Sequence, residues 1–195
     1  MSLLVPSRTE LITATTPVSY LRPEEVDRMV DAAGRMPRHR DRNQVLVQVL
    51  FSTGLRISEA LALTPSSIGS VDGIPILTVV GKGRKRRRVA CPEELLHRLR
   101  SYAYTHHVGT EDRVFPIARN SAWRIISQAG RMAGLGKRVW PHLLRHSYAI
   151  EALRQTGNTK ALQIHLGHAS LPMTMRYLST LTEEDAVKIM GQVRV

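Results

Sequence analysis

The sequence predicts a mainly α-helical domain with one small antiparallel β-sheet, an α+β fold. Apolar residues recur at helical spacing over most of the chain from Tyr20 onward, whereas β-branched residues concentrate in one segment, 74–90. The 195 residues are 43% hydrophobic, which is enough for one full core but not for two large domains. Residues 1–19 show no periodicity and are expected to be a mobile tail or the remnant of a linker, so the domain is predicted to span 20–195.

Three helices are predicted in the first part of the domain. Pro23 and the two glutamates behind it suit a first helical turn, and Gly34 closes that helix. A nearly all-apolar second helix covers 43–53, and a short third helix covers 57–63. Arg56 therefore lies at the entry of the third helix.

A hairpin and further helices follow. Residues 74–80 and 86–90 are expected to pair as antiparallel strands across a basic, glycine-containing turn at 81–85. Helical patterns then return in six segments: 93–103, 120–133, 141–155, 159–166, 172–177 and 183–193.

Charge and composition favour a polyanionic partner. The chain carries 28 Lys and Arg against 16 Asp and Glu, a formal charge of +12, and each phosphate that such a cation neutralises releases counterions. Two Phe and two Trp are few for the stacking platforms of single-strand binders, so double-stranded DNA is the expected partner. The chain has no apolar run of membrane-spanning length, and its single cysteine, Cys91, excludes an intrachain disulfide. A soluble cytoplasmic protein with no membrane partner is expected.

The turn of the predicted hairpin holds the densest charge. Six of the seven residues from Lys82 to Arg88 are cationic, which favours a nearby anion, although a solvated charged loop is the alternative. Lys82, between two glycines, is the candidate general acid, because neighbouring cations favour the loss of its proton. The other cations are expected to bind DNA phosphates: Arg84, Lys85, Arg86, Arg87 and Arg88.

His142 and Arg145 form a second candidate group. They lie three residues apart on a predicted helix and share a face, so both side chains can reach one anionic group. The core-facing positions of that helix, among them Leu143 and Ser147, occupy a different face, which leaves the first face free for function.

Histidine spacing also allows a metal site. His142 with His146, and His165 with His168, have spacings found among zinc ligands. Because no carboxylate or cysteine accompanies them, the phosphate-binding interpretation is preferred and no metal site is predicted.

Tyr177 is a candidate nucleophile nine residues after His168. A lone tyrosine on a short helix is usually a core residue, and a phenol is a poor nucleophile until cations stabilise the charge on the phosphate that it attacks. This sequence supplies such cations.

These motifs occur in the order found in the tyrosine recombinases and integrases, which share their chemistry with type IB topoisomerases, and the chain resembles that family. Tyr177 falls at the spacing expected of the family's nucleophile, and the resemblance extends from about Tyr20 to the end of the chain. The segments that resemble the first arginine box, the hairpin lysine, the second box and the third box are, in order, 53–61, 80–83, 142–147 and 166–170.

The resemblance implies a site-specific recombinase that cleaves and rejoins duplex DNA through a covalent 3′-phosphotyrosyl link to Tyr177. Arg56 and Arg145 would hold the non-bridging oxygens of the scissile phosphate and stabilise the transition state. His168 would donate another hydrogen bond to that phosphate.

The remaining roles also come from the resemblance. His142 would assist removal of the Tyr177 proton or position it, Lys82 would protonate the leaving 5′ oxygen, and Glu59 would support the site from behind. No metal or nucleotide cofactor is implied. A type IB topoisomerase-like relaxing enzyme and an inactive DNA-binding relative are the alternative functions.

The resemblance has implications for assembly and length as well. Self-association on DNA as a tetrameric synapse is expected, with the 183–193 helix docked on a neighbouring protomer and accessory DNA-bending proteins as further partners in the nucleoid. Most members carry a DNA-clamping domain ahead of this region, where this chain has about nineteen residues. Either a longer protein is truncated here, or the chain belongs with short members such as the fimbrial phase-variation recombinases.

Overall fold

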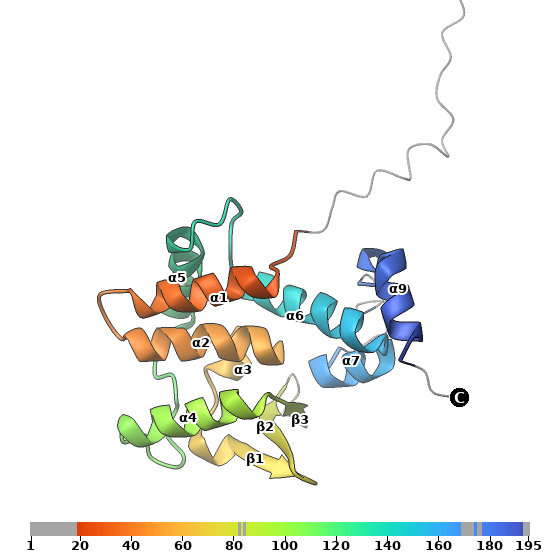
Figure 1. Cartoon of the computed structure of the whole chain (residues 1–195). Coiled ribbons are helices and arrows are strands. Elements are labelled where there is room, and N and C mark those ends of the chain that lie inside the picture. Colours follow the sequence, from red (N-terminus) through yellow and green to blue (C-terminus); the bar gives the residue numbers. More distant parts are fainter. Residues whose placement is uncertain (1–18, 82, 84, 169–173, 175–176, 193–195) are drawn as a thin grey trace, which may run out of the picture.

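Helices make up most of the described part of the chain, and a three-stranded antiparallel sheet lies at one side (Figure 1). The computed structural model describes residues 19–81, 83, 85–168, 174 and 177–192. The predicted fold class is confirmed. No helix in these ranges has the length and hydrophobicity needed to cross a membrane. In chain order the elements are α1 (Pro23–Gly34), α2 (Arg40–Thr53), α3 (Ile57–Ala60), η2 (Pro65–Ser67), β1 (Ile68–Val71), β2 (Ile74–Val80), β3 (Arg86–Ala90), α4 (Glu93–Thr105), α5 (Arg119–Met132), α6 (Pro141–Thr156), α7 (Thr159–Leu166), η4 (Leu178–Thr180) and α9 (Glu183–Met190).

The central helix of the main core is α2. It packs against α1, α4 and α6, and α1 in turn packs against α5. Val45, Leu46 and Val49 on α2 are fully buried, which explains its nearly continuous apolar sequence. The helix begins at Arg40 rather than at residue 43, because its first turn is polar and exposed and gives no apolar signal. At its other end Thr53 and Leu55 are buried, so the chain runs through the interior just before Arg56.

The sheet has the order β1-β2-β3. The predicted strands 74–80 and 86–90 are both present, paired with Leu77 opposite Val89. The sequence prediction extended α3 to residue 63, although the helix ends at Ala60. It also missed β1, which pairs with β2 across the turn Asp72-Gly73. Both turn residues have positive φ, 51° and 78°, the geometry for which an Asp-Gly pair is a strong hairpin signal.

A second, smaller apolar cluster lies between α6 and α7. Leu153 on α6, Leu162 and Leu166 on α7, and the ring of Tyr177 belong to it. Figure 1 shows α6 running from the α1–α2 pair to α7 and α9. The helix predicted at 172–177 lies largely outside the described residues.

The last helix, α9, packs in cis on α6. A Cβ added at Gly157, directly after α6, would come within 2.8 Å of the side chain of Ile189 on α9, so this side chain packs against the end of α6. Arg154 on α6 reaches Asp185 on α9 at 3.3 Å. Docking of this helix on a neighbouring protomer stays a prediction.

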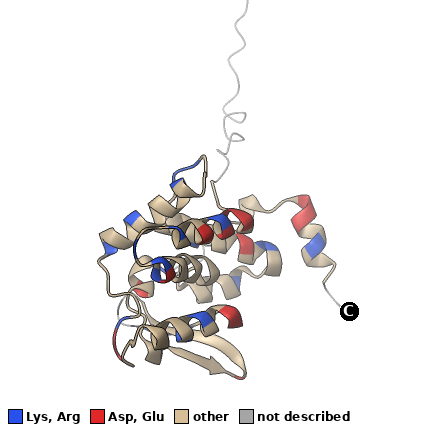
Figure 2. Cartoon of the chain, turned by 60° about the vertical axis from the view of Figure 1, so that its left-hand side comes forward, with Lys and Arg blue, Asp and Glu red and all other residues tan. Residues whose placement is uncertain are grey.

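Several helices carry both acidic and basic residues (Figure 2). The first turns of α1, α4 and α9 each carry acidic side chains, which the positive end of a helix dipole stabilises. Much of the acidic charge thus serves helix ends, and basic residues are left in excess on the remaining surface.

Candidate active site

A cavity of about 270 Å³ brings three predicted catalytic residues together. Arg56, at the start of α3, and His142 and Arg145, on the first turns of α6, all line it. Arg119 and Trp123 of α5 also line it. No motif marks these two residues for the site, because they precede the second box by about twenty residues.

Arg145 is buried, and this corrects the expectation that its helix face is free of the core. Its side chain donates from Nη1 to the Gly54 carbonyl at 2.6 Å and from Nη2 to the Leu166 carbonyl at 2.8 Å, and the residue is 2% exposed. Only His142 of the pair is exposed. Burial first, and then the charge of Arg56, lower the pKa of Arg145 to about 10, so its guanidinium remains protonated at neutral pH.

Gly54 makes the approach of Arg145 possible. It ends α2 with φ of 62°, and a Cβ there would lie 2.4 Å from the ring of Tyr148. A larger residue would therefore be strained and would collide with α6. The glycine of the first arginine box thus places a main-chain acceptor in front of Arg145.

Glu59 lies behind Arg56 and receives four N–H groups. Its Oε1 accepts from Arg56 Nη1 at 2.9 Å and from Arg87 Nη1 at 2.8 Å. Its Oε2 accepts from the Arg56 backbone N–H and from Arg87 Nη2, both at 2.9 Å. Burial alone would raise the pKa of Glu59, but the hydrogen bonds from Arg87 and Arg56 outweigh burial and lower it. The carboxylate is therefore ionised and pairs with two arginines.

The carboxyl end of α7 accepts hydrogen bonds from three arginines. Arg87 Nε donates to the carbonyl of His165, Arg145 Nη2 to that of Leu166, and Arg56 Nη2 to that of Gly167, at 2.9, 2.8 and 3.2 Å. Helix ends leave such carbonyls without intrahelical partners and carry partial negative charge, which suits cations. One helix end therefore fixes both arginines of the proposed phosphate site.

Tyr177 is buried beside two histidines. Its ring centroid lies 5.0 Å from that of His146 and 6.5 Å from that of His168. The Thr174 hydroxyl lies 2.8 Å from Nδ1 of His168. The charge of the ionised Tyr177 phenol would raise the pKa of Arg145, so the two groups are within electrostatic reach. In the sequence analysis His146 was a candidate only for metal binding, although it lies one turn beyond His142 on the same helix.

His165 forms its contacts away from His146 and His168. Its Nε2 lies 3.0 Å from the Thr53 carbonyl and 2.9 Å from the Tyr148 hydroxyl, and burial is the main cause that lowers the pKa of the imidazole. Within the described ranges, no group of three or more His, Cys, Asp or Glu side chains is arranged to hold a metal ion.

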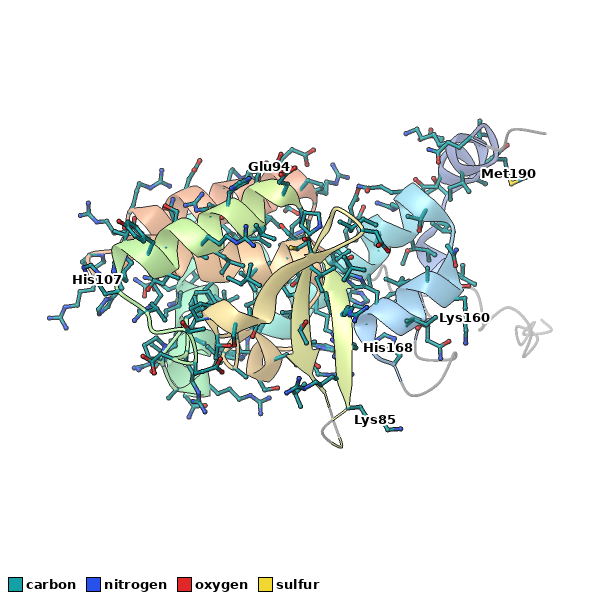
Figure 3. All side chains as sticks on the ribbon, turned by 90° about the horizontal axis from the view of Figure 1, so that it is seen from below. Lys85, Glu94, His107, Lys160, His168 and Met190 are labelled. Atoms are coloured by element: carbon teal, nitrogen blue, oxygen red, sulfur yellow. The ribbon has the colours of Figure 1, made fainter. Side chains whose placement is uncertain are left out.

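The basic run divides into outward and inward side chains. Lys85, Arg86 and Arg88 are exposed, whereas the side chain of Arg87 is 15% exposed and points toward Glu59. Figure 3 shows Lys85 at the hairpin tip, on the same side of the molecule as His168. Lys82 and Arg84 lie outside the described residues.

Comparison with known proteins places the chain among the tyrosine recombinases. It is 34% identical over 182 residues to tyrosine recombinase XerA of Pyrococcus furiosus, covering 87% of this chain and 60% of the relative. It is 33% identical over 147 residues to tyrosine recombinase XerD of Corynebacterium glutamicum, covering 70% and 47%. The chain thus spans about half the length of these curated relatives.

The crystal structure of XerA recombinase matches with a TM-score of 0.71 and 28% identity, over 91% of this chain and 64% of that one. The phage integrase family model matches residues 19–184. The chain belongs to this family, and the resemblance inferred from the motifs is confirmed.

Proposed function

We propose that this chain is the catalytic domain of a site-specific recombinase that cleaves and rejoins duplex DNA through a 3′-phosphotyrosyl bond to Tyr177. The observation that carries the proposal is the shared wall of Arg56, His142 and Arg145 around one cavity, with the Tyr177 phenol in electrostatic reach of Arg145. Two guanidinium groups at one cavity suit the non-bridging oxygens of a phosphodiester.

The proposed step balances without a cofactor. The phenol oxygen of Tyr177 forms a bond to phosphorus as the bond from phosphorus to the 5′ oxygen breaks. His142 takes up or orients the phenol proton, and Lys82 gives a proton to the departing 5′ oxygen. Arg56, Arg145 and His168 stabilise the added negative charge on the phosphate, and attack by the 5′ hydroxyl reverses the step.

The exposed cations of the hairpin are proposed to bind the DNA backbone. Lys85, Arg86 and Arg88 support this role by their exposure on one side of the β2–β3 hairpin, and Arg84 is assigned to it from the sequence. Arg87 is not assigned to DNA contact, because its guanidinium is occupied by Glu59 and His165.

Assembly on DNA is also a proposal. The same fold occurs in a lambda integrase tetramer bound to a Holliday junction, with a TM-score of 0.64 and 20% identity. In this chain α9 leaves Val187 and Met190 exposed, and such apolar side chains would be covered if several copies assembled. We propose self-association on DNA, where accessory DNA-bending proteins would act as additional partners.

Covalent capture tests the proposed function. The protein is incubated with a pool of nicked duplexes whose sequence around the nick is randomised, and adducts that survive denaturation are recovered and sequenced. The chain should yield such adducts, and Tyr177→Phe should yield none, because that change removes only the attacking oxygen and keeps the packed ring. An adduct from Tyr177→Phe would refute the nucleophile, and specific binding without any adduct would identify a DNA-binding protein instead. Relaxation of supercoils without strand exchange on the recovered site would indicate the topoisomerase alternative.

A further inference from the structure

Arg87 differs from the other described cations of the basic run in the direction of its side chain. Alternate residues of a strand point to opposite faces, and β3 follows this rule, since Arg86 and Arg88 are exposed and Arg87 is half-buried. Its guanidinium turns toward α3 and α7 rather than toward solvent. A row of five consecutive cations hides this alternation in the sequence.

The surroundings of Arg87 fit its guanidinium closely. Nη1 and Nη2 donate to the two oxygens of Glu59 at 2.8 and 2.9 Å, and Nε donates to the His165 carbonyl at 2.9 Å. A Cβ at Gly167 would lie 3.1 Å from Nε, and one at Gly81 would lie 3.3 Å from Nη1. Two glycines of the sequence boxes thus leave room for this one side chain. Lysine could not reproduce the three bonds, because it carries a point charge instead of a planar fork.

The contacts of Glu59 show how Arg87 would act. The carboxylate is 3% exposed at its side chain and touches both Arg56 and Arg87. Without Arg87, Arg56 is the described residue that still neutralises this buried carboxylate, and its charge would be held by Glu59. With Arg87 in place, two guanidinium groups share one carboxylate, and a net positive charge remains on the side of the cavity that Arg56 lines.

We propose that Arg87 is a positioning residue for DNA cleavage: it neutralises Glu59 and so leaves the charge of Arg56 directed to the scissile phosphate. Arg87 touches no substrate in this account and acts through Glu59. The inference rests on the proposed function, since it concerns the same reaction.

A matched pair of variants separates positioning from DNA binding. Arg87→Gln and Arg88→Ala each remove one positive charge from neighbouring positions of β3. Using the nicked duplex recovered by covalent capture, we expect Arg88→Ala to weaken binding and to lower the slope of log affinity against log salt by about one. Arg87→Gln should leave affinity and slope within about twofold of the parent and lower the single-turnover cleavage rate at saturating protein by at least about tenfold.

Suppression by a second change distinguishes positioning from a loss of structure. In Arg87→Gln the charge of Glu59 is balanced by Arg56 and no longer by Arg87, whereas in Glu59→Gln with Arg87→Gln there is no charge to neutralise and the amide oxygen can still accept from Arg56. The double variant should therefore cleave at least about fivefold faster than Arg87→Gln. Arg87→Lys, which keeps the charge near Glu59, should retain the parent salt slope and recover part of the rate.

Each outcome decides the matter. If Arg87→Gln lowers the salt slope as Arg88→Ala does, Arg87 is a phosphate ligand and the proposal is overturned. If Arg87→Gln is unfolded at the assay temperature, Arg87→Lys takes its place, and a parent cleavage rate in that variant rejects the fork geometry. Failure of the proposed function is a separate result, because the parent chain itself would then form no adduct.

Discussion

Arg145→Ala should weaken the fold as well as cleavage, whereas Arg56→Ala should weaken cleavage with little effect on stability. The two arginines share a proposed role but not an environment. Arg145 is 2% exposed and satisfies two buried carbonyls, while the side chain of Arg56 is 36% exposed. Arg145→Ala therefore leaves buried carbonyl groups without a donor, whereas Arg56→Ala changes a more exposed part of the site.

The magnitude follows from the contacts of Arg145. Each carbonyl left unsatisfied costs about 1–3 kcal/mol, and the two methylenes that alanine lacks contribute about 2 kcal/mol of lost burial. Against this, burial and the charge of Arg56 lower the pKa of Arg145 to about 10, which corresponds to about 3 kcal/mol of unfavourable free energy that the substitution relieves. The net loss is about 3 kcal/mol, equivalent to a fall in Tm of about 6–12 °C for a domain of this size.

Thermal unfolding followed by circular dichroism measures this difference, and single-turnover cleavage below both transitions measures the catalytic loss. Both variants should cleave at least about 100-fold more slowly, the scale for one lost transition-state donor. Arg145→Lys is the control, because it keeps the charge but cannot bridge the Gly54 and Leu166 carbonyls. Equal unfolding temperatures for Arg145→Ala and Arg56→Ala would refute the argument from buried carbonyls.

Three further changes test other parts of the site. Lys82→Ala should slow cleavage of ordinary DNA but not of a substrate with a 5′-bridging sulfur, whose leaving group needs no proton; equal defects would exclude a general acid. Deleting 183–195 should abolish cooperative filling of paired half-sites in a binding titration, and unchanged cooperativity would mean that α9 serves only its own domain. The lowered pKa of Glu59 means that its ionised form stabilises the fold above about pH 4.5 and that this contribution is lost as the pH falls through the folded-state pKa. Glu59→Gln should thus flatten the acid side of the stability profile, and an unchanged slope of unfolding free energy against pH would contradict this.

The fold class and the hairpin were predictable because each rests on local pattern. Helical periodicity and the β-branched segment 74–80 depend on residues that are neighbours in sequence, and the strand bounds agree with the structure. The strand β1 was missed because it is four residues long, although its Asp72-Gly73 turn carried a usable signal.

The sequence motifs nominate candidate site residues, but they do not give the arrangement of those residues. The burial of Arg145 depends on acceptors 91 and 21 residues away, and no local pattern encodes such contacts. The sequence pattern does not predict the inward direction of the Arg87 side chain, because its neighbours in the sequence are also cations. His146 lacked a signal because nothing in the sequence places it against Tyr177.

The hydrogen bonds at the end of α7 have a consequence for how this domain could lose its activity in evolution. A family member that becomes a passive DNA-binding protein would ordinarily shed its reactive residues one at a time. Here the buried carbonyls of Gly54 and Leu166 depend on Arg145, so a lineage that discards this arginine also loses contacts that hold α6 against α2 and α7. Such a lineage would first need other contacts that hold these helices together. Tyr177, the proposed nucleophile, could lose its phenol oxygen most simply, since its ring would continue to fill the same apolar cluster.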